Sequence, residues 1–253
     1  MDNIPEEKVV LITGALSDIG KATAQAFAQA GYAIVLNYRH KPEKATLLAD
    51  ALRRDWNAPR SVAIQADVRH RTEVQSMVEQ TVQTFGRLDI LINNAGINRD
   101  RSFTEMTDDE WETVQDTILK GTFMCSQEFA RRYQGEAGNI INIGAVTAVK
   151  GRKNGVNYCS ARAGVLALTK CMALELAPKI RVNTVTPGRI DTEEVRERYQ
   201  IDDGNKRARF EQDIPMAGMG KPEDIAAMIL FLVETGKYIT GQNFFVDGGL
   251  FMR

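Results

Sequence analysis

Short runs of consecutive apolar residues alternate with longer amphipathic stretches along most of the chain. The apolar runs are rich in Val, Ile and Leu, as strands are; they occupy residues 8–13, 33–36, 62–64, 88–92, 139–143 and 181–185. The stretches between them have helical patterns and occupy residues 19–30, 42–54, 72–85, 108–133 and 158–176. Strands that are apolar at consecutive positions bury both faces, which a parallel sheet covered by crossover helices provides. The alternation predicts an α/β fold, a Rossmann-type doubly wound parallel sheet.

The last third of the chain departs from this alternation. Residues 193–212 are dense in charge and include Asp202-Asp203-Gly204, which excludes a central strand. We interpret about residues 193–215 as a small, charged, mobile helical lid. A helix is predicted from Pro222 to residue 233, because Pro suits the first helical position, and a last strand at 244–246. No linker, repeat or low-complexity tract is present, so residues 1–253 are predicted to form a single domain.

Composition excludes several classes of function. The chain balances 32 Lys and Arg against 33 Asp and Glu, so it lacks the positive field that holds nucleic acid or an anionic membrane surface. Its N-terminus lacks the basic region and the apolar region of a secretory signal peptide. Its longest apolar runs, such as 228–233, are about a third of the ~20 residues that cross a bilayer. We therefore expect a cytoplasmic protein.

Cysteine and histidine are too few for metal or hydrolase chemistry. Cys125, Cys159 and Cys171 show no C-x-x-C spacing, and an odd number of cysteines without a signal peptide is typical of a reducing compartment. The histidines, His40 and His70, supply neither a His-based metal site nor a Ser-His-Asp triad. We expect no disulfide and no metal site.

A glycine-rich segment, Thr13-Gly-Ala-Leu-Ser-Asp-Ile-Gly20, joins the first strand to the first helix. The backbone amides at such a helix start, together with the helix dipole, favour an anion such as a pyrophosphate. By itself the segment is compatible with either a dinucleotide site or a simple tight turn.

Further motifs follow in a fixed order. They are Asp67-Val68 after the third strand, Asn93-Asn-Ala-Gly96 after the fourth, Tyr158 at a helix start, Pro187-Gly188 after the sixth strand, and the segments 238–241 and 246–249. With the T-G-x-x-x-G-x-G pattern at 13–20, they make the chain similar to the short-chain dehydrogenase/reductase family from about residue 8 to residue 249. Within the family it resembles the 3-oxoacyl-carrier-protein-reductase type. The resemblance implies a nicotinamide cofactor and a carbonyl substrate, either a small molecule or bound to a carrier.

The resemblance also implies a set of cofactor-binding residues. The glycine loop would hold the diphosphate, residues after the third and fourth strands would meet adenine and ribose, and the loop after the sixth strand would hold the nicotinamide. The set is Gly14, Ser17, Ile19, Gly20, Asn37, Arg39, Asp67, Val68, Asn94, Ala95, Gly96, Tyr158, Arg162, Pro187, Gly188, Ile190 and Thr192.

Three positions bear on the cofactor. After the second strand the chain has Asn37 and Arg39 instead of an acid. A guanidinium binds a 2′-phosphate that a carboxylate would repel, so NADP(H) is favoured over NAD(H), with a solvated basic loop as the alternative.

In the glycine loop, Asp18 replaces the second glycine. Its carboxylate either crowds the pyrophosphate or caps the helix, and we favour the cap.

The catalytic positions depart furthest from the family pattern. Relatives use Tyr as the acid, Lys to favour the tyrosinate, Ser to bond the carbonyl oxygen and Asn to anchor a relay water. In this chain Tyr158 is present, and the replacements for Lys, Ser and Asn are Arg162, Ala145 and Ile118. Tyr158 and Arg162 are the predicted catalytic residues. Losing the Ser donor alone is expected to slow the reaction by about 10²- to 10³-fold.

Neighbouring side chains are candidates to substitute for the lost groups. Thr147 and Ser160 carry hydroxyls close in sequence to Ala145 and Tyr158, although both also suit capping or turn roles. A basic loop before Tyr158 either attracts an acidic carrier or phosphate or is simply solvated; it contains Lys150, Arg152 and Lys153.

Three functions are compatible with this sequence. The first is an atypical NADP(H)-dependent oxidoreductase with impaired chemistry that reduces a ketone, such as a 3-oxoacyl thioester. The second is a catalytically silent, nucleotide-binding subunit paired with an active relative, and the third is a non-redox enzyme that reuses the pocket. The resemblance implies a homotetramer or a hetero-oligomer, built on the helices 108–133 and 158–176 and the C-terminal segment.

Overall fold

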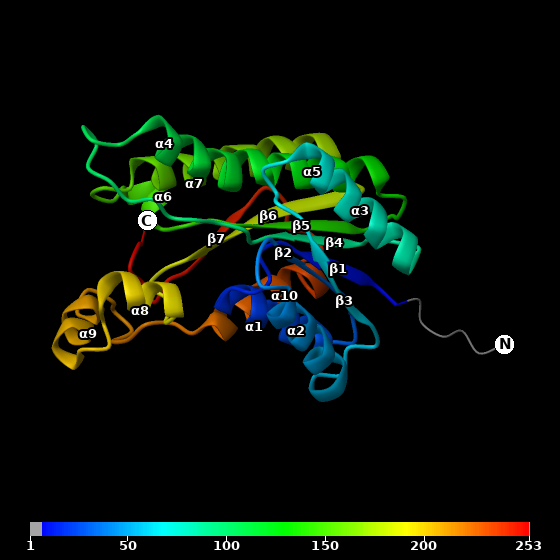
Figure 1. Cartoon of the computed structure of the whole chain (residues 1–253), viewed down its shortest axis with the longest axis horizontal. Coiled ribbons are helices and arrows are strands. Elements are labelled where there is room, and N and C mark those ends of the chain that lie inside the picture. Colours follow the sequence, from blue (N-terminus) through cyan, green and yellow to red (C-terminus); the bar gives the residue numbers. More distant parts are fainter. Residues whose placement is uncertain (1–6, 253) are drawn as a thin grey trace.

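Seven strands lie side by side in one sheet, in the order β3-β2-β1-β4-β5-β6-β7 (Figure 1). The computed structural model describes residues 7–252. The strands are β1 (Val9–Ile12), β2 (Ala33–Tyr38), β3 (Ser61–Gln65), β4 (Ile90–Asn93), β5 (Gly138–Ile143), β6 (Ile180–Pro187) and β7 (Asn243–Val246). Every neighbouring pair is parallel, which confirms the predicted sheet.

Helices cover both faces of this sheet (Figure 1). One layer contains α1 (Asp18–Gln29), α2 (Pro42–Asp55) and α10 (Pro222–Glu234). The other layer contains α3 (Arg71–Phe85), α4 (Asp108–Gln115), α5 (Gly121–Arg132) and α7 (Val156–Leu176). In residues 7–252, no helix combines the length and the apolar character that a membrane span needs.

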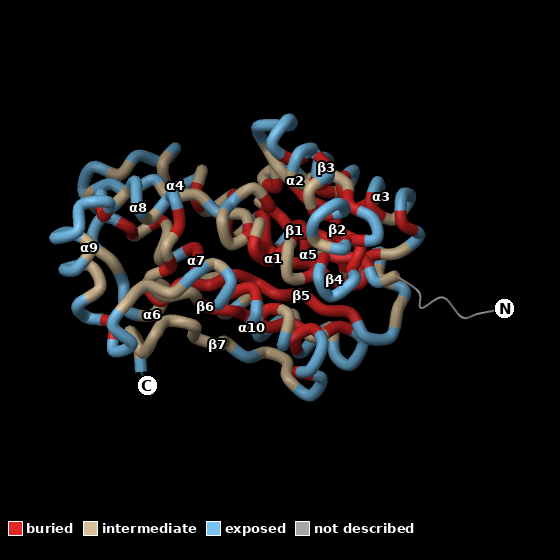
Figure 2. Tube along the Cα trace, turned by 90° about the horizontal axis from the view of Figure 1, so that it is seen from below, coloured by how far each residue is buried: buried red, intermediate tan, exposed pale blue. Residues whose placement is uncertain are grey.

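Successive residues of the central strand β1 face opposite helical layers. Val10 and Ile12 belong to the core cluster shared with α1 and α10, whereas Val9 and Leu11 belong to the cluster shared with α3 and α5. All four side chains are fully buried, and Figure 2 shows the buried residues concentrated in the central strands and the helix faces against them. Burial on both faces explains why apolar residues are consecutive in this strand.

One segment differs from its predicted form. The helix expected over 108–133 is divided by a π-helical segment, η1 (Asp116–Lys120), which lies between α4 and α5. Such segments frequently mark functional sites, and this one contains Ile118. The segment predicted as a lid forms two short helices, α8 (Glu193–Tyr199) and α9 (Gly204–Glu211), at one end of the molecule (Figure 1).

The strand order determines where a ligand can enter. β1 pairs with β2 on one side and with β4 on the other, so the chain leaves β1 and β4 toward opposite helical layers. In parallel α/β sheets, ligands bind in the crevice outside the carboxyl ends of strands at such a point. The glycine loop after β1 and the segment 94–96 after β4 both begin there.

Candidate active site

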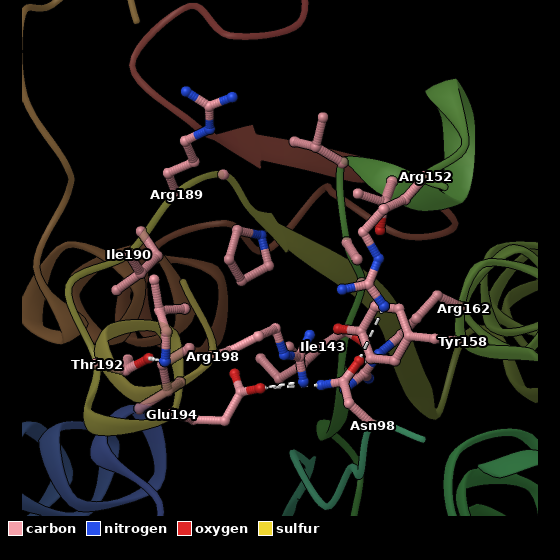
Figure 3. Close-up of a pocket in the computed structure, with 18 of the residues that line it drawn as sticks. Asn98, Ile143, Arg152, Tyr158, Arg162, Arg189, Ile190, Thr192, Glu194 and Arg198 are labelled. Atoms are coloured by element: carbon pink, nitrogen blue, oxygen red, sulfur yellow. Dashed lines mark hydrogen bonds and ion pairs between the residues drawn. The ribbon is translucent and has the colours of Figure 1, made fainter. Parts of the chain in front are cut away.

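A cleft of about 480 Å³ opens at the carboxyl ends of the central strands and is bordered by α8 (Figure 3). Many residues predicted from the sequence meet on its wall: Ser17, Ile19, Asn94, Tyr158, Arg162, Pro187, Gly188, Ile190 and Thr192. The other predicted residues lie outside this wall: Gly14, Gly20, Asn37, Arg39, Asp67, Val68, Ala95 and Gly96. The fold therefore joins the expected diphosphate, nicotinamide and catalytic segments in one cavity.

The shape of the glycine loop depends on its contact with the segment after β4. The side-chain amide of Asn94 donates to the carbonyl oxygens of Thr13 and Gly14, both at 2.9 Å, and to Ser17 Oγ at 3.1 Å. Gly14 has a φ of +60°, and a Cβ at this position would lie 2.9 Å from the Cα of Ala95. Only glycine tolerates both the dihedral angle and the close approach.

The start of α1 has free backbone amides beside the cleft. Ser17 is the N-cap, and its hydroxyl accepts a hydrogen bond of 3.2 Å from the amide of Gly20. Among residues 7–252, the amides of Asp18 and Ile19 have no acceptor. Unpaired amides at a helix start, with the helix dipole behind them, bind anions. This loop therefore fits the diphosphate of a dinucleotide.

Asp18 caps a different helix from the one that we predicted. Its carboxylate accepts a hydrogen bond of 2.7 Å from the amide of Glu193 at the start of α8, and lies 3.5 Å from Lys21 Nζ. The prediction that Asp18 caps α1 is wrong, because Ser17 already holds that position and residue 18 lies in the first turn. The contact of Asp18 connects the glycine loop to the lid.

Asn37 is a buried side chain that connects neighbouring segments of the protein. It is 2% exposed; its side-chain oxygen accepts from the amide of Gly14 at 3.2 Å, and its nitrogen donates to the carbonyl oxygen of Ala66 at 3.0 Å. Both ends of the amide are thus engaged within the protein. Asn37 is uncharged, so position 37 brings no negative charge that would repel a bound cofactor.

A charged group lies at the carboxyl ends of β2 and β3. Asp67 accepts hydrogen bonds from Arg69 Nε at 3.0 Å and Arg69 Nη2 at 2.7 Å, and Arg39 Nη1 lies 3.8 Å from the same carboxylate. Burial alone would raise the pKa of Asp67, but the bonds from Arg69 and the charge of Arg39 hold this pKa below its usual range. Two cations therefore share one ionised carboxylate. No sequence motif marked Arg69, although it directly follows the Asp67-Val68 motif.

Tyr158 lies in the first turn of α7, on the wall of the cleft. The guanidinium carbons of Arg152 and Arg162 lie 5.2 Å and 5.3 Å from the centre of its ring. Among residues 7–252, no group forms a hydrogen bond with its hydroxyl. Ile118 is fully buried in the apolar cluster against which the Tyr158 ring packs. Position 118 therefore brings no polar side chain to the site.

Arg162 is a buried cation, with 5% of its surface exposed. Its Nη1 donates to the carbonyl oxygen of Ile143 at 2.5 Å, and its Nε has no partner. Gly96 leaves room for the guanidinium, because a Cβ there would lie 2.5 Å from Nη2. No carboxylate of residues 7–252 pairs with Arg162. A buried cation without a counter-ion attracts negative charge, either a tyrosinate or an anionic group of a ligand.

The lid is held at the opposite side of the cleft by polar contacts that the sequence argument missed. Arg152 donates to Asp100 at 2.7 Å and to Asn98 at 3.1 Å. Asn98 donates to Glu194 of α8 at 3.3 Å (Figure 3), and Arg198 of α8 lies 3.8 Å from Asp100. With a side chain 15% exposed, Arg152 is not a solvated loop residue. No motif marked Asn98, Asp100 or Arg198.

Of the two hydroxyls considered as substitutes for serine, Thr147 lines the cleft and Ser160 does not. The Ser160 hydroxyl donates to the carbonyl oxygen of Val156 at 2.6 Å and accepts from Gln115 at 3.1 Å. Thr147 begins the short helix α6 (Thr147–Lys150), and its Oγ1 is buried without a partner. Ala145, also on the wall, contributes only a methyl group.

The cysteines lie away from the cleft wall and are unpaired. Cys125 is buried, and burial raises the pKa of its thiol to about 12, whereas Cys171 is exposed. Within residues 7–252, no group of three or more His, Cys, Asp or Glu side chains comes together as a metal site would require.

Comparison with known proteins gives a consistent family assignment. Residues 14–251 match the family model described as Enoyl-(Acyl carrier protein) reductase. The 3-oxoacyl-[acyl-carrier-protein] reductase FabG of Staphylococcus aureus is 39% identical over 248 residues, which cover 97% of this chain and 98% of the relative. The 3-oxoacyl-[acyl-carrier-protein] reductase of Synechocystis is 38% identical over 250 residues, covering 97% of each chain.

Solved structures agree with these sequence relatives. A mutant short-chain dehydrogenase/reductase from Serratia marcescens superposes with a TM-score of 0.88 at 31% identity, covering 97% of this chain and 99% of that one. A short-chain dehydrogenase/reductase from Brucella melitensis, described as glucose/ribitol dehydrogenase, gives a TM-score of 0.88 at 27% identity, with 98% and 99% covered.

Proposed function

Because this chain belongs to the short-chain dehydrogenase/reductase family, we propose that it uses NADP(H) to reduce a carbonyl group, such as that of a 3-oxoacyl thioester. The observation that carries the proposal is that a single cleft borders the free amides of α1 and the side chain of Tyr158. An anion site and a proton donor in one cavity suit a reaction between a dinucleotide and a neighbouring carbonyl. The chain's similarity to reductases of 3-oxoacyl carriers supports this substrate class.

In the proposed reaction, a reduced nicotinamide, when bound, would supply the hydride that the carbonyl carbon accepts. Tyr158 donates its hydroxyl proton to the carbonyl oxygen, which becomes an alcohol. The positive charge of Arg162 stabilises the tyrosinate that remains, and solvent returns the proton. The amides of Asp18 and Ile19 hold the diphosphate. The nicotinamide is assigned to the wall formed by Pro187, Gly188, Ile190 and Thr192.

The preference for NADP(H) is assigned to Arg39. Asn37 brings no carboxylate that would repel a 2′-phosphate, and Asp67 is already neutralised by Arg69. Arg39, whose side chain is 36% exposed, remains available to a phosphate. We expect R39A to weaken NADPH binding about tenfold while NADH binding is unchanged. Equal affinity of the unaltered protein for NADPH and NADH in a fluorescence titration would reject this assignment.

The proposal includes impaired chemistry. Ala145 gives no hydrogen bond to a developing oxyanion, and losing one such donor typically costs about 2.7 to 4 kcal/mol. Ile118 anchors no relay water. We expect these two losses to slow the reaction least when the substrate carbonyl is intrinsically reactive. The substrate is either a free molecule or one attached to an acidic carrier. Lys150 and Lys153, which are exposed close to the cleft, would attract an acidic carrier.

A second candidate function is a catalytically silent, nucleotide-binding subunit that pairs with an active relative. The replacements at Ala145, Arg162 and Ile118 favour it, because they affect three of the four positions that relatives use for catalysis. The two candidates differ in a simple way: the silent subunit binds NADPH and does not oxidise it, even with a wide range of ketones.

The decisive experiment follows NADPH oxidation with 3-oxoacyl thioesters and simple ketones. We expect turnover by the unaltered protein and none by Y158F, because phenylalanine has no proton to donate. Y238F is the matched control, since Tyr238 is fully exposed outside the cleft and should keep full turnover. Unchanged turnover in Y158F would eliminate Tyr158 as the acid, and absence of turnover in the unaltered protein would favour the silent subunit.

A further inference from the structure

Buried polar atoms without hydrogen-bond partners gather at the cleft. Within residues 7–252, such side-chain atoms occur on Glu7, Ser61, Asn93, Asn139, Thr147, Arg152 and Arg162. Thr147, Arg152 and Arg162 all line the cleft, and Thr147 carries the hydroxyl among them. A buried hydroxyl without a partner destabilises a fold by about 1–3 kcal/mol. Its presence at this particular place therefore requires an explanation.

Five other helical threonines in this protein satisfy their hydroxyls locally. They donate to the carbonyl oxygen four residues earlier, as seen at Thr23, Thr46, Thr81, Thr117 and Thr169. Thr147 is the first residue of α6, so the residue four positions earlier, Ile143, lies at the end of β5; its carbonyl oxygen accepts from Arg162 Nη1 and receives no hydrogen bond from Thr147. Figure 3 shows Ile143, Tyr158 and Arg162 at the same cavity. The Ile143 carbonyl oxygen is thus engaged by Arg162, and the Thr147 hydroxyl is left without a partner.

We propose that the Thr147 hydroxyl donates a hydrogen bond to the carbonyl oxygen of the substrate, the role that Ala145 cannot perform. This inference rests on the proposed carbonyl reduction. The hydride still goes to the carbonyl carbon and the proton still comes from Tyr158. Thr147 keeps its own proton and stabilises the negative charge that develops on the oxygen.

The backbone holds Thr147 near that position. The amide of Val146 donates to the carbonyl oxygen of Pro187 at 3.3 Å, and the amide of Ala148 donates to that of Ala145 at 3.0 Å. This tight turn keeps positions 145 and 147 on the same wall, which Tyr158 also lines. Oγ1 is buried, so the proposed role requires χ1 to turn to another staggered position that faces the cleft. Rotation of the Thr147 side chain about χ1 breaks no hydrogen bond, and threonine readily populates two rotamers in a helix.

The experiment compares T147V and T147S with the unaltered protein, using a short 3-oxoacyl thioester at saturating NADPH. Valine has nearly the same shape without the hydroxyl, so we expect T147V to lower kcat by about 10²- to 10³-fold. T147S should retain most of the activity. Adding A145S to T147V should recover at least tenfold of the lost rate. The melting temperature of T147V should not fall, because the substitution removes no hydrogen bond; a purely structural role would lower it.

A binding measurement tests the same hydrogen bond without turnover. We would titrate the NADPH-bound protein with the corresponding 3-hydroxyacyl thioester, which cannot accept a hydride from NADPH. We expect T147V to bind it at least tenfold more weakly than the unaltered protein, and A145S/T147V to recover the affinity. Unchanged kcat and unchanged affinity in T147V would overturn the assignment of Thr147 and leave the proposed reductase function standing. Failure of the unaltered protein to bind or reduce any such thioester would overturn both.

Discussion

Arg162 and Arg181 are both guanidinium groups without a carboxylate partner among residues 7–252, and their surroundings differ greatly. Arg162 pairs with one carbonyl oxygen, that of Ile143. Arg181 donates to four, including those of Leu232 and Gly236 at 2.7 Å each, and so completes the last turn of α10. A charge that satisfies several carbonyl oxygens supports the fold, whereas Arg162 lines the cleft and satisfies one carbonyl oxygen.

The same substitution, arginine to methionine, should therefore change the free energy of unfolding by different amounts at positions 181 and 162. R181M removes four hydrogen bonds and leaves the carbonyl oxygens of Leu232 and Val233 without a donor, so it should lower the free energy of unfolding by about 3 kcal/mol. R162M removes a poorly compensated buried charge and should change it by less than about 1 kcal/mol, because apolar replacements of buried charges are often neutral. Denaturant unfolding of the two variants measures the difference. Equal destabilisation would show that Arg162 has a structural role.

Stability at high pH should depend on Cys125. Burial raises the pKa of its thiol from 9.0 to about 12, so between these values the unfolded chain loses a proton that the folded chain keeps. The unfolded state then binds fewer protons, and the free energy of unfolding must fall as the pH rises from about 9. Unfolding measured from about pH 8 to pH 11 should show a smaller decline for C125A than for the unaltered protein. C171A, at an exposed cysteine, should retain the original slope.

The lid is fastened to both walls of the cleft by contacts between elements. Asp18 accepts from the amide of Glu193, which connects α8 to the glycine loop, and Asn98 donates to Glu194 on the other side. Asp191 joins the two lid helices by accepting from Arg196 at 2.6 Å and Arg207 at 2.8 Å. The burial of Asp191 opposes ionisation, but these two arginines hold its pKa below the usual range. These contacts join α8 and α9 to each other and to both walls of the cleft.

The contact of Asp18 with the lid predicts how a cofactor exchanges. D18N keeps an oxygen that can accept from the Glu193 amide and removes the negative charge beside the diphosphate site, so NADPH should bind about tenfold more tightly. D18G removes the charge and the lid contact, so NADPH should also dissociate faster than from D18N. Stopped-flow fluorescence measures both rates. Identical dissociation rates in the two variants would show that the Asp18 contact does not retain the lid.

Exposed apolar side chains on the surface of the whole molecule support the expected oligomer. Trp111 and Phe123 lie on α4 and α5, and Leu174 lies on α7 and is 85% exposed. These are the segments on which the family resemblance places subunit contacts. Large exposed apolar side chains of this kind commonly form interfaces.

A homotetramer with two kinds of interface predicts a simple series of masses. Light scattering should give a tetramer for the unaltered protein, dimers for L174E and for F123E, and a monomer for the double variant, because a buried charge at an interface prevents association. L47E is the control: Leu47 is 67% exposed on α2, outside the expected interfaces, and this variant should remain tetrameric. A monomer for the unaltered chain would instead favour a hetero-oligomer with a related subunit.

The sequence by itself determined the sheet, the helical layers and the place of the glycine loop. Consecutive apolar residues such as Val9 to Ile12 can be satisfied only by burial on both faces, and this requirement is local to each strand. The motifs around Asn94, Tyr158 and Pro187 were likewise readable in order along the chain.

Tertiary structure alone decided which distant side chains meet. Asp18 and Glu193 are 175 positions apart, and among 33 acidic and 32 basic residues the sequence does not identify such pairs. Arg162 reaches the carbonyl oxygen of Ile143 from another helix, and the Thr147 hydroxyl beside it has no partner. Contacts of this kind follow from how helices dock on the sheet, and that docking is a property of the packed core as a whole.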